Sequence, residues 1–300
     1  MNIKKWIQEQ PAHIVLIAIN VAVFAIQSLS VVILGLLKIN NVDYLTDLFS
    51  LHSDLNEFMF KPWGIFTYMF LHDGISHLFW NMIFLFLVGK VFESYFNKSI
   101  TFSVFIVGGL ISGLATLLAY NLFPEVMTKG DHQMVGASGS IYSIILGITS
   151  YKHRVSIPII SSFAIPVLFL SIIKVLVDLS TLASDVRDDG IFNINTGGHI
   201  AHLAGATYGV VFGLQYKKGK NILSWYQKLN SRFSSNKTSY NSNMKVVYRK
   251  SAKNVSDEDY NYSKQSNEQR LNDILDKVGK SGYDSLSKEE KDFLNFISNR

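Results

Sequence analysis

The 300-residue chain is 48% hydrophobic, is only 17% charged and has a mean hydropathy of +0.19, which argues against a soluble globular protein. It contains no cysteine, so disulfides, thiolate catalysis and cysteine-type zinc sites are excluded. Residues 1–216 carry 11 Lys/Arg and 13 Asp/Glu, and residues 217–300 carry 17 and 10. The basic tail lacks a nucleic-acid-binding motif, so we expect it to contact anionic lipid, with no nucleic-acid partner.

The N-terminal segment begins with Lys4 and Lys5 and continues into a long apolar run. This run is longer and bulkier than the core of a signal peptide, so we predict a retained membrane span. Five further segments have the composition of membrane helices, for which about 20 residues cross the hydrocarbon. The six predicted helices are residues 13–36, 74–94, 101–121, 138–151, 155–177 and 198–216.

The predicted fold is an all-α, polytopic bundle of six transmembrane helices over residues 1–216. Lys and Arg are more frequent on the side that holds both termini, which predicts that this side is cytoplasmic. We expect a multi-pass protein of the bacterial inner membrane. The loop 37–73 is amphipathic and is expected to lie at the membrane interface.

The C-terminal part divides into a predicted flexible, basic linker over 217–264 and a predicted cytoplasmic helical hairpin over 265–300. Within the hairpin, Ser287 and Glu290 have the spacing of a capping box, which indicates the start of a second helix.

Gly136-Ala137-Ser138-Gly139 directly precedes the fourth apolar segment. Ser138 would therefore lie at a helix start, where free N–H groups and the helix dipole favour negative charge. An oxyanion formed on a Ser138 adduct would benefit from both. The alternative is that Ser138 is only a helix cap, with glycine supplying a turn.

Ala201-His202-x-Ala204-Gly205-x-x-x-Gly209 lies in the sixth apolar segment. His202, Gly205 and Gly209 share one helix face, and their Gly-x-x-x-Gly pattern favours close helix packing. Gly139 and Ser143 form a matching pair on the fourth helix. Packing of these two faces would bring His202 close to Ser138, the minimum arrangement for an activated hydroxyl. The alternative for His202, and the interpretation we favour for His199, is a structural histidine.

His77 and Asn81, at positions i and i+4 near the start of the second helix, share a face. Both side chains have hydrogen-bond donors that could stabilise an oxyanion at Ser138. The alternative is polar contact between helices.

This ordered set of motifs resembles the rhomboid family of intramembrane proteases over roughly residues 55–216. The resemblance implies that Ser138 attacks the scissile carbonyl and that His202 takes its proton, without a catalytic carboxylate, a metal or a cofactor. It implies that the Ser138 amide, His77 and Asn81 bind the oxyanion, and Gly136 belongs to the same motif. The substrates would be single-span membrane proteins, cleaved near the outer end of their helix.

Further residues extend the resemblance. Tyr142 matches a tyrosine that stacks on the catalytic histidine, and Glu93 matches a structural glutamate. The family usually has Trp-Arg in its first loop, whereas Trp63 is followed here by Gly64, so the bonds of that arginine must be absent or replaced.

Three alternatives remain open from the sequence. The first is a catalytically inactive rhomboid-like protein that binds or escorts membrane helices. The second is a small transporter, for which Lys174 and Asp178 are the candidate intramembrane charges, although their i, i+4 spacing also suits mutual pairing. The third is metal catalysis involving His132 or His199, which we disfavour because no His-Glu-x-x-His pattern is present.

Overall fold

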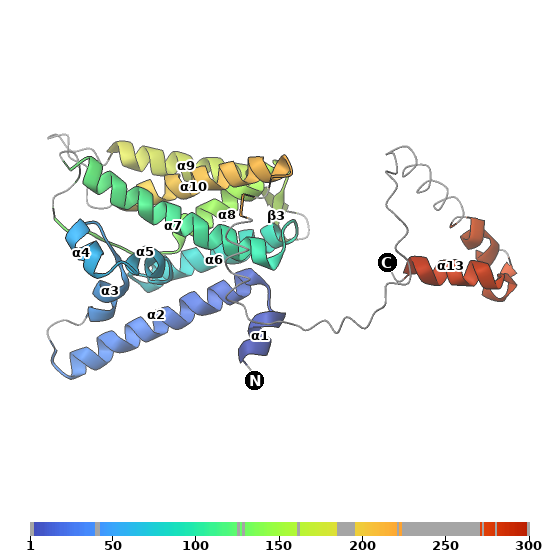
Figure 1. The fold of residues 1–300 in the computed structure, drawn as a ribbon, viewed down its shortest axis with the longest axis horizontal. Helices are drawn as coiled ribbons and strands as arrows, with labels where there is room; N and C mark the ends of the chain where they lie inside the picture. Colours follow the sequence, from blue (N-terminus) through green and yellow to red (C-terminus); the bar gives the residue numbers. More distant parts are fainter. Residues whose placement is uncertain are drawn as a thin grey trace, which may run out of the picture. The chain divides into compact units, whose positions relative to one another are not determined.

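The computed structural model describes residues 3–39, 43–124, 127, 130–160, 163–184, 196–220, 222–223, 271, 273–279 and 281–298. The chain divides into two compact units, residues 1–235 and 236–300. The first unit is mostly helical (Figure 1). Its longer helices are α2 (Ala12–Leu36), α6 (Ile75–Glu93), α7 (Lys98–Leu122), α8 (Ser138–Tyr151), α9 (Val167–Ser184) and α10 (Thr196–Lys217), and α1 (Ile3–Glu9) precedes them.

Four of these helices, α2, α6, α7 and α9, are long and apolar enough to cross a membrane. The chain is therefore an integral membrane protein with a mainly helical fold. The helix α8 has 14 residues and is about 21 Å long, which is less than the roughly 30 Å of a bilayer core. Its start must therefore lie at membrane depth if its end reaches the membrane surface.

The short helix α8 lies at the centre of the bundle and packs against α6, α7, α9 and α10. Its contact with α10 is the closest, because three glycines of α10 face the α8 backbone. A Cβ atom placed on Gly205, Gly209 or Gly213 would lie 2.2, 2.5 or 2.3 Å from a carbonyl oxygen of α8. The predicted packing of these two helices through small residues is thus confirmed.

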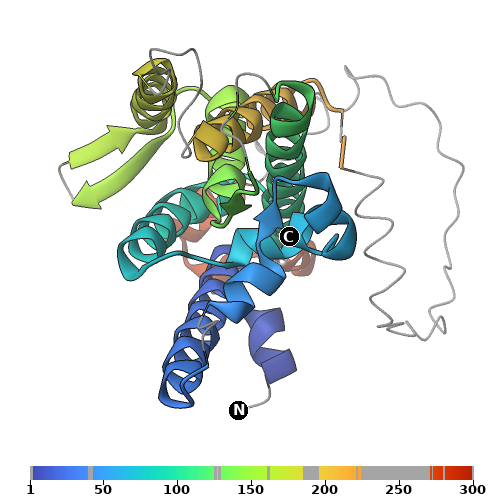
Figure 2. The same ribbon diagram turned by 90° about the vertical axis from the view of Figure 1, so that its left-hand side faces the viewer.

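The prediction of a fifth helix over 155–177 is wrong at both ends. Residues of that range form an antiparallel hairpin of β3 (Ser156–Ile160) and β4 (Phe163–Pro166), and α9 begins only at Val167. Figure 2 shows this hairpin projecting from the bundle beside α9. A short apolar run does not by itself distinguish strand from helix, and Pro166 lacks the N–H that a helix interior needs. The fold is accordingly not purely α-helical.

The opposite end of the bundle carries short elements that we call the loop end (Figure 1). They are α3 (Tyr44–Phe49), β1 (Leu51–His52), α4 (Leu55–Phe60), α5 (Gly64–Thr67), η1 (Tyr68–Phe70) and β2 (Gln133–Met134). The strands β1 and β2 pair antiparallel, with Leu51 opposite Met134. This pairing fixes the segment that leads into Ser138, the first residue of α8.

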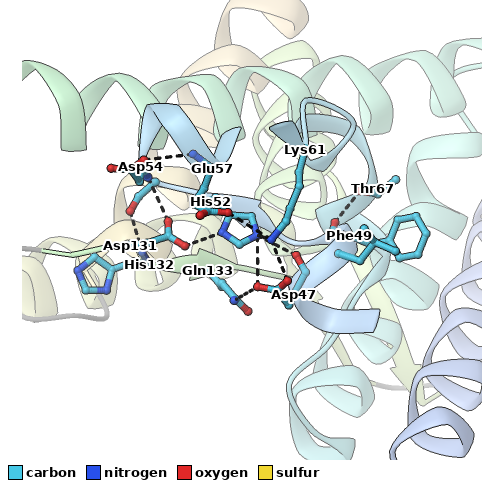
Figure 3. Close-up of polar contacts among 12 residues, drawn as sticks. Asp47, Phe49, His52, Asp54, Glu57, Lys61, Thr67, Asp131, His132 and Gln133 are labelled. Carbon is cyan, nitrogen blue, oxygen red and sulfur yellow. Dashed lines mark hydrogen bonds and ion pairs between the residues drawn. The ribbon is translucent and has the colours of Figure 1, made fainter. Parts of the chain in front are cut away.

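A polar network holds the loop end together (Figure 3). His52, which is 1% exposed, has Nδ1 2.5 Å from Asp131 Oδ2 and Nε2 2.7 Å from the Asp47 carbonyl oxygen. Lys61 Nζ donates to Asp47 Oδ2 at 2.8 Å. Burial disfavours the charged form of Asp131, but the interaction with His52 and the hydrogen bonds from the backbone of Asp54 and Ser53 together outweigh it and lower the pKa of that carboxyl.

The Trp63-Gly64 pair has a structural explanation at the loop end. A Cβ atom on Gly64 would lie 2.3 Å from the Ser50 carbonyl oxygen, so no side chain fits in this conformation. Trp63 Nε1 donates to the Leu48 carbonyl at 2.7 Å, and Thr67 Oγ1 donates to the Phe49 carbonyl at 2.6 Å. These bonds tie α5 to α3 without an arginine.

Glu93, at the end of α6, binds the start of α2. Its carboxylate accepts the Ala12 backbone N–H at 2.6 Å and also contacts His13 Nδ1. A carboxylate at a helix N-terminus satisfies free N–H groups and complements the helix dipole. Gly89, one turn earlier, lets His13 approach, because a Cβ there would lie 2.5 Å from the His13 Cβ.

The second unit contains η2 (Tyr283–Ser285) and α13 (Lys288–Ser298), and residues 273–279 are also helical. The predicted capping box is confirmed, since Glu290 N donates to Ser287 Oγ at 3.2 Å and Ser287 N to Glu290 Oε2 at 2.7 Å. Lys277 Nζ lies 2.9 Å from Glu290 Oε2, between the two helical segments. The predicted linker lies almost wholly outside the described residues.

Candidate active site

Ser138 is the first residue of α8 and is partly buried. Gly136, two residues earlier, has a φ of +125°, a conformation that glycine adopts at little cost, and its N–H donates to the Tyr68 carbonyl at 2.9 Å. The chain therefore turns sharply into α8, and Ser138 lies in the first turn, whose N–H groups have no partner within the helix. This is the favourable end of a helix for negative charge.

The structure brings Ser138 and His202 together. His202 Nε2 lies 2.7 Å from Ser138 Oγ, across the glycine-lined contact between α8 and α10. The Tyr142 ring, one turn along α8, is stacked on the His202 ring with centroids 4.6 Å apart and an interplanar angle of 8°. Tyr142 thus holds the His202 imidazole parallel to its own ring, and Nε2 of His202 faces the Ser138 hydroxyl.

Asp178 of α9 is a member of this cluster that the sequence interpretation missed. Its Oδ1 lies 2.8 Å from His202 Nδ1 and 2.8 Å from His199 Nδ1, and its other oxygen accepts the Tyr142 hydroxyl. The residue is only 3% exposed. Lys174 does not lie against this carboxylate; its Nζ is over the rings of Phe84 and Tyr142, 4.4 and 4.6 Å from their centroids.

His77 reaches the segment before Ser138 from α6. A Cβ atom on Gly136 would lie 2.9 Å from His77 Nε2, and His77 Nδ1 is 2.6 Å from Asp73 Oδ1. Because an ionised carboxylate only accepts, the Nδ1–H of His77 donates to Asp73. A neutral His77 would then present an unprotonated Nε2, so this ring can donate to an oxyanion only as an imidazolium.

Asn81 lies one turn deeper on α6 than His77. It is 7% exposed, and its Nδ2 has no hydrogen-bond partner among the described residues. A buried amide donor without an acceptor is costly. Asn81 therefore has donor capacity to spare for an acceptor that arrives with a ligand.

His72, just before α6, is 1% exposed, and its ring packs against that of His77 with centroids 5.0 Å apart. Burial, reinforced by the nearby His77, lowers the pKa of His72 from 6.5 to about 4. Between these values the unfolded chain binds a proton that the folded chain does not. The free energy of unfolding should therefore decrease as the pH is lowered through this range, by up to about 3 kcal/mol.

We expect His72→Gln to flatten this dependence, seen as a smaller difference between the melting temperatures at pH 7 and pH 5 in detergent. The exposed His153→Gln variant is the matched control and should keep the wild-type difference. An equal pH dependence in wild type and His72→Gln would contradict the assignment.

A cavity of about 210 Å³ lies at the loop end beside this cluster. Its wall includes His77, Val135 and the start of α10 at Gly197–Gly198. The remaining lining is largely polar and includes His52, Ser53, Asp73, Thr116, Tyr120, His132 and Gln133. His132 therefore lies on the cavity wall, with its ring 5.3 Å from that of Tyr120, and not in the cluster around Asp178.

Asp178, His199 and His202 offer ligand atoms within 4.8 Å of one another, a spacing that a metal ion could use. Hydrogen bonding accounts for the same geometry, because both imidazole Nδ1 atoms lie at 2.8 Å from one carboxylate oxygen. A zinc ion there would need both nitrogens deprotonated and further ligands.

Apolar helices around a hydroxyl and an imidazole at a helix start define a polytopic membrane protein with a candidate catalytic centre. A model of the Rhomboid domain matches residues 60–218, more than half of the chain. The chain belongs to the rhomboid family. Rhomboid-related protein 1 of Caenorhabditis elegans is 27% identical over 173 residues, which are 54% of this chain and 44% of that protein.

The chain thus spans less than half the length of this relative. Residues 255–300 match a second model, described as a family of unknown function (DUF6576). This match includes the whole C-terminal segment in which a helical hairpin was predicted.

Proposed function

We propose that this protein is an intramembrane serine endopeptidase that cleaves single-span membrane proteins near the outer end of their transmembrane helix. The observation that carries the proposal is the 2.7 Å contact between Ser138 Oγ and His202 Nε2 at the start of α8. A hydroxyl nucleophile is activated by such a base, and membership of the rhomboid family agrees with this chemistry.

In the proposed first step, Ser138 Oγ bonds to the substrate carbonyl carbon as its proton moves to His202 Nε2. The carbonyl π electrons become the oxyanion. The tetrahedral intermediate then collapses, the C–N bond breaks, and His202 returns the proton to the leaving amine. Water attacks the acyl-enzyme by the same route, which releases the acid product and restores the Ser138 hydroxyl.

The oxyanion would lie near the N-terminus of α8, where the Ser138 backbone N–H belongs to the first turn and has no partner within the helix. The unpartnered Asn81 amide supports a second donor. His77 would contribute as an imidazolium held by Asp73, and Gly136 leaves room for its ring. Tyr142 would position His202 through the stacked contact.

Water must reach the acyl-enzyme in an apolar bundle. The polar cavity beside His77 and Val135 supports a supply of water at the loop end. The short α8 would keep the nucleophile below the membrane surface but within reach of this water.

The remaining parts of the proposal concern placement. The loop end would face the outside of a bacterial inner membrane, with both termini in the cytoplasm. The basic linker over 217–264 would lie near the anionic inner leaflet, and the C-terminal hairpin would be a cytoplasmic module.

Co-expression with tagged single-span reporter proteins tests the proposal. Wild-type protein should generate a shorter tagged fragment whose new end maps to the outer part of the reporter helix, and Ser138→Ala should not. A protein that captures the reporter in both forms but never cleaves it would instead be an inactive, helix-binding member of the family.

A further inference from the structure

Asp178 is a buried carboxylate for which the proposed Ser138–His202 chemistry has not yet given a role. It lies in the second half of α9, is 3% exposed, and accepts hydrogen bonds from His202, His199 and Tyr142. A charge in an apolar bundle is costly unless it is paired and hydrogen-bonded. Three donors from two other helices converge on this one group, so it is built into the site.

The contact with His202 fixes the tautomer of that ring. An ionised carboxylate has no hydrogen to donate, so the proton between Asp178 Oδ1 and His202 Nδ1 belongs to the imidazole. A neutral His202 then has an unprotonated Nε2, and this is the nitrogen that lies 2.7 Å from Ser138 Oγ. The opposite tautomer would present an N–H to the hydroxyl and could not accept its proton.

We propose that Asp178 is the positioning residue of His202, so that Ser138, His202 and Asp178 work as one hydrogen-bonded unit. This inference rests on the proposed function. Asp178 keeps its charge throughout: it accepts the Nδ1–H bond, orients the ring, and stabilises the imidazolium that forms when Ser138 loses its proton. No proton passes to the carboxylate.

The charges around Asp178 agree with this role. His199 and His202 face it from α10, Tyr142 faces it from α8, and Lys174 lies one turn earlier on α9. The Lys174 ammonium is 4.6 Å from the Tyr142 ring centroid. Without Asp178, the imidazolium of His202 would form next to a lysine with no opposing charge.

Asp178→Asn is the sharpest test, because asparagine has the same shape and its oxygen can still accept from His202. It removes the charge and replaces one of the two accepting oxygens with an amide NH2, which only donates. We expect the kcat for reporter cleavage in proteoliposomes to fall by about 100-fold or more with little change in KM. The acid limb of the pH profile of kcat should move to lower pH by about one unit or more. The reason is that the His202 imidazolium loses the stabilising negative charge of Asp178.

Asp131→Asn is the matched control, since Asp131 also accepts from a buried histidine, His52, but at the loop end. It should leave the acid limb in place. Asp178→Ala should also lose orientation of the ring and be slower than Asp178→Asn. If folded Asp178→Asn and Asp178→Ala proteins retain the wild-type kcat and acid limb, the positioning role is wrong.

The tautomer of His202 supplies a readout that does not depend on activity. Nitrogen NMR of protein with 15N-labelled histidine, in detergent at neutral pH, should show His202 protonated at Nδ1 in wild type and Ser138→Ala. In Asp178→Ala this preference should be lost. Wild type that neither cleaves nor binds a fluorophosphonate would refute the proposed function alone, whereas an Nε2-protonated His202 in wild type would refute the role of Asp178.

Discussion

Replacing Ser138 or His202 with alanine should lower the rate of reporter cleavage by about 10⁴-fold or more in each case. Both residues act in one step, so the double variant should be no slower than either single variant. Ser138→Ala should also abolish covalent labelling by a fluorophosphonate, which reports the nucleophile directly. The measurement is fragment yield and labelling in detergent and in liposomes.

Ser140→Ala is the matched control for this prediction. Ser140 is a buried serine of the same helix whose hydroxyl lies 4.0 Å from the Met69 sulfur, and its loss should leave most of the activity. Activity should also disappear by pH 4, because a protonated His202 cannot accept the Ser138 proton. Additive losses in the double variant, or full cleavage at pH 4, would contradict the shared step.

The second large effect is expected at the contact between α8 and α10. Gly209→Leu adds a Cβ that would lie 2.5 Å from the Ser143 carbonyl oxygen, so the two helices must move apart. Overpacking of this kind typically costs about 1–3 kcal/mol. A displacement of about 1 Å between nucleophile and base costs about 100-fold in rate, so we expect both the melting temperature and the cleavage rate to fall.

Thr207→Leu provides the comparison, because Thr207 lies on the exposed face of the same helix and gains the same side chain. It should retain the melting temperature and the rate of the wild type. Wild-type activity in Gly209→Leu would mean that the close approach of the two helices is not needed to align Ser138 with His202.

Much of the bundle could be predicted from the sequence, because apolar length and glycine spacing are local signals. The helices α2, α6, α7, α8 and α10 lie within a few residues of their predicted ranges. The contact between α8 and α10 was predictable because Gly205 and Gly209 lie on one face with His202. The strands β1 and β2 were not, since each has two residues and their pairing is set by tertiary contacts.

The candidate site was only partly predictable. The meeting of Ser138 with His202 followed from helix faces, but the role of Asp178 depended on where α9 begins. Placing that helix at 155–177 put Asp178 beyond its end, where pairing with Lys174 was the natural interpretation. Pro166 was the available signal, because proline is favoured at helix starts and disfavoured inside helices.

Because Asp178 lies on α9, the entry of a substrate and the alignment of His202 depend on the same helix. Only 17% of the most apolar stretch of α9 is buried, compared with 61% in α7. The helix α9 is therefore packed less extensively against the rest of the protein than α7. Any outward swing of α9 that admits a substrate helix also carries the carboxylate away from the imidazole. Such an enzyme would be inactive in the open state. It would regain the geometry needed for proton transfer only after α9 has closed on the bound substrate.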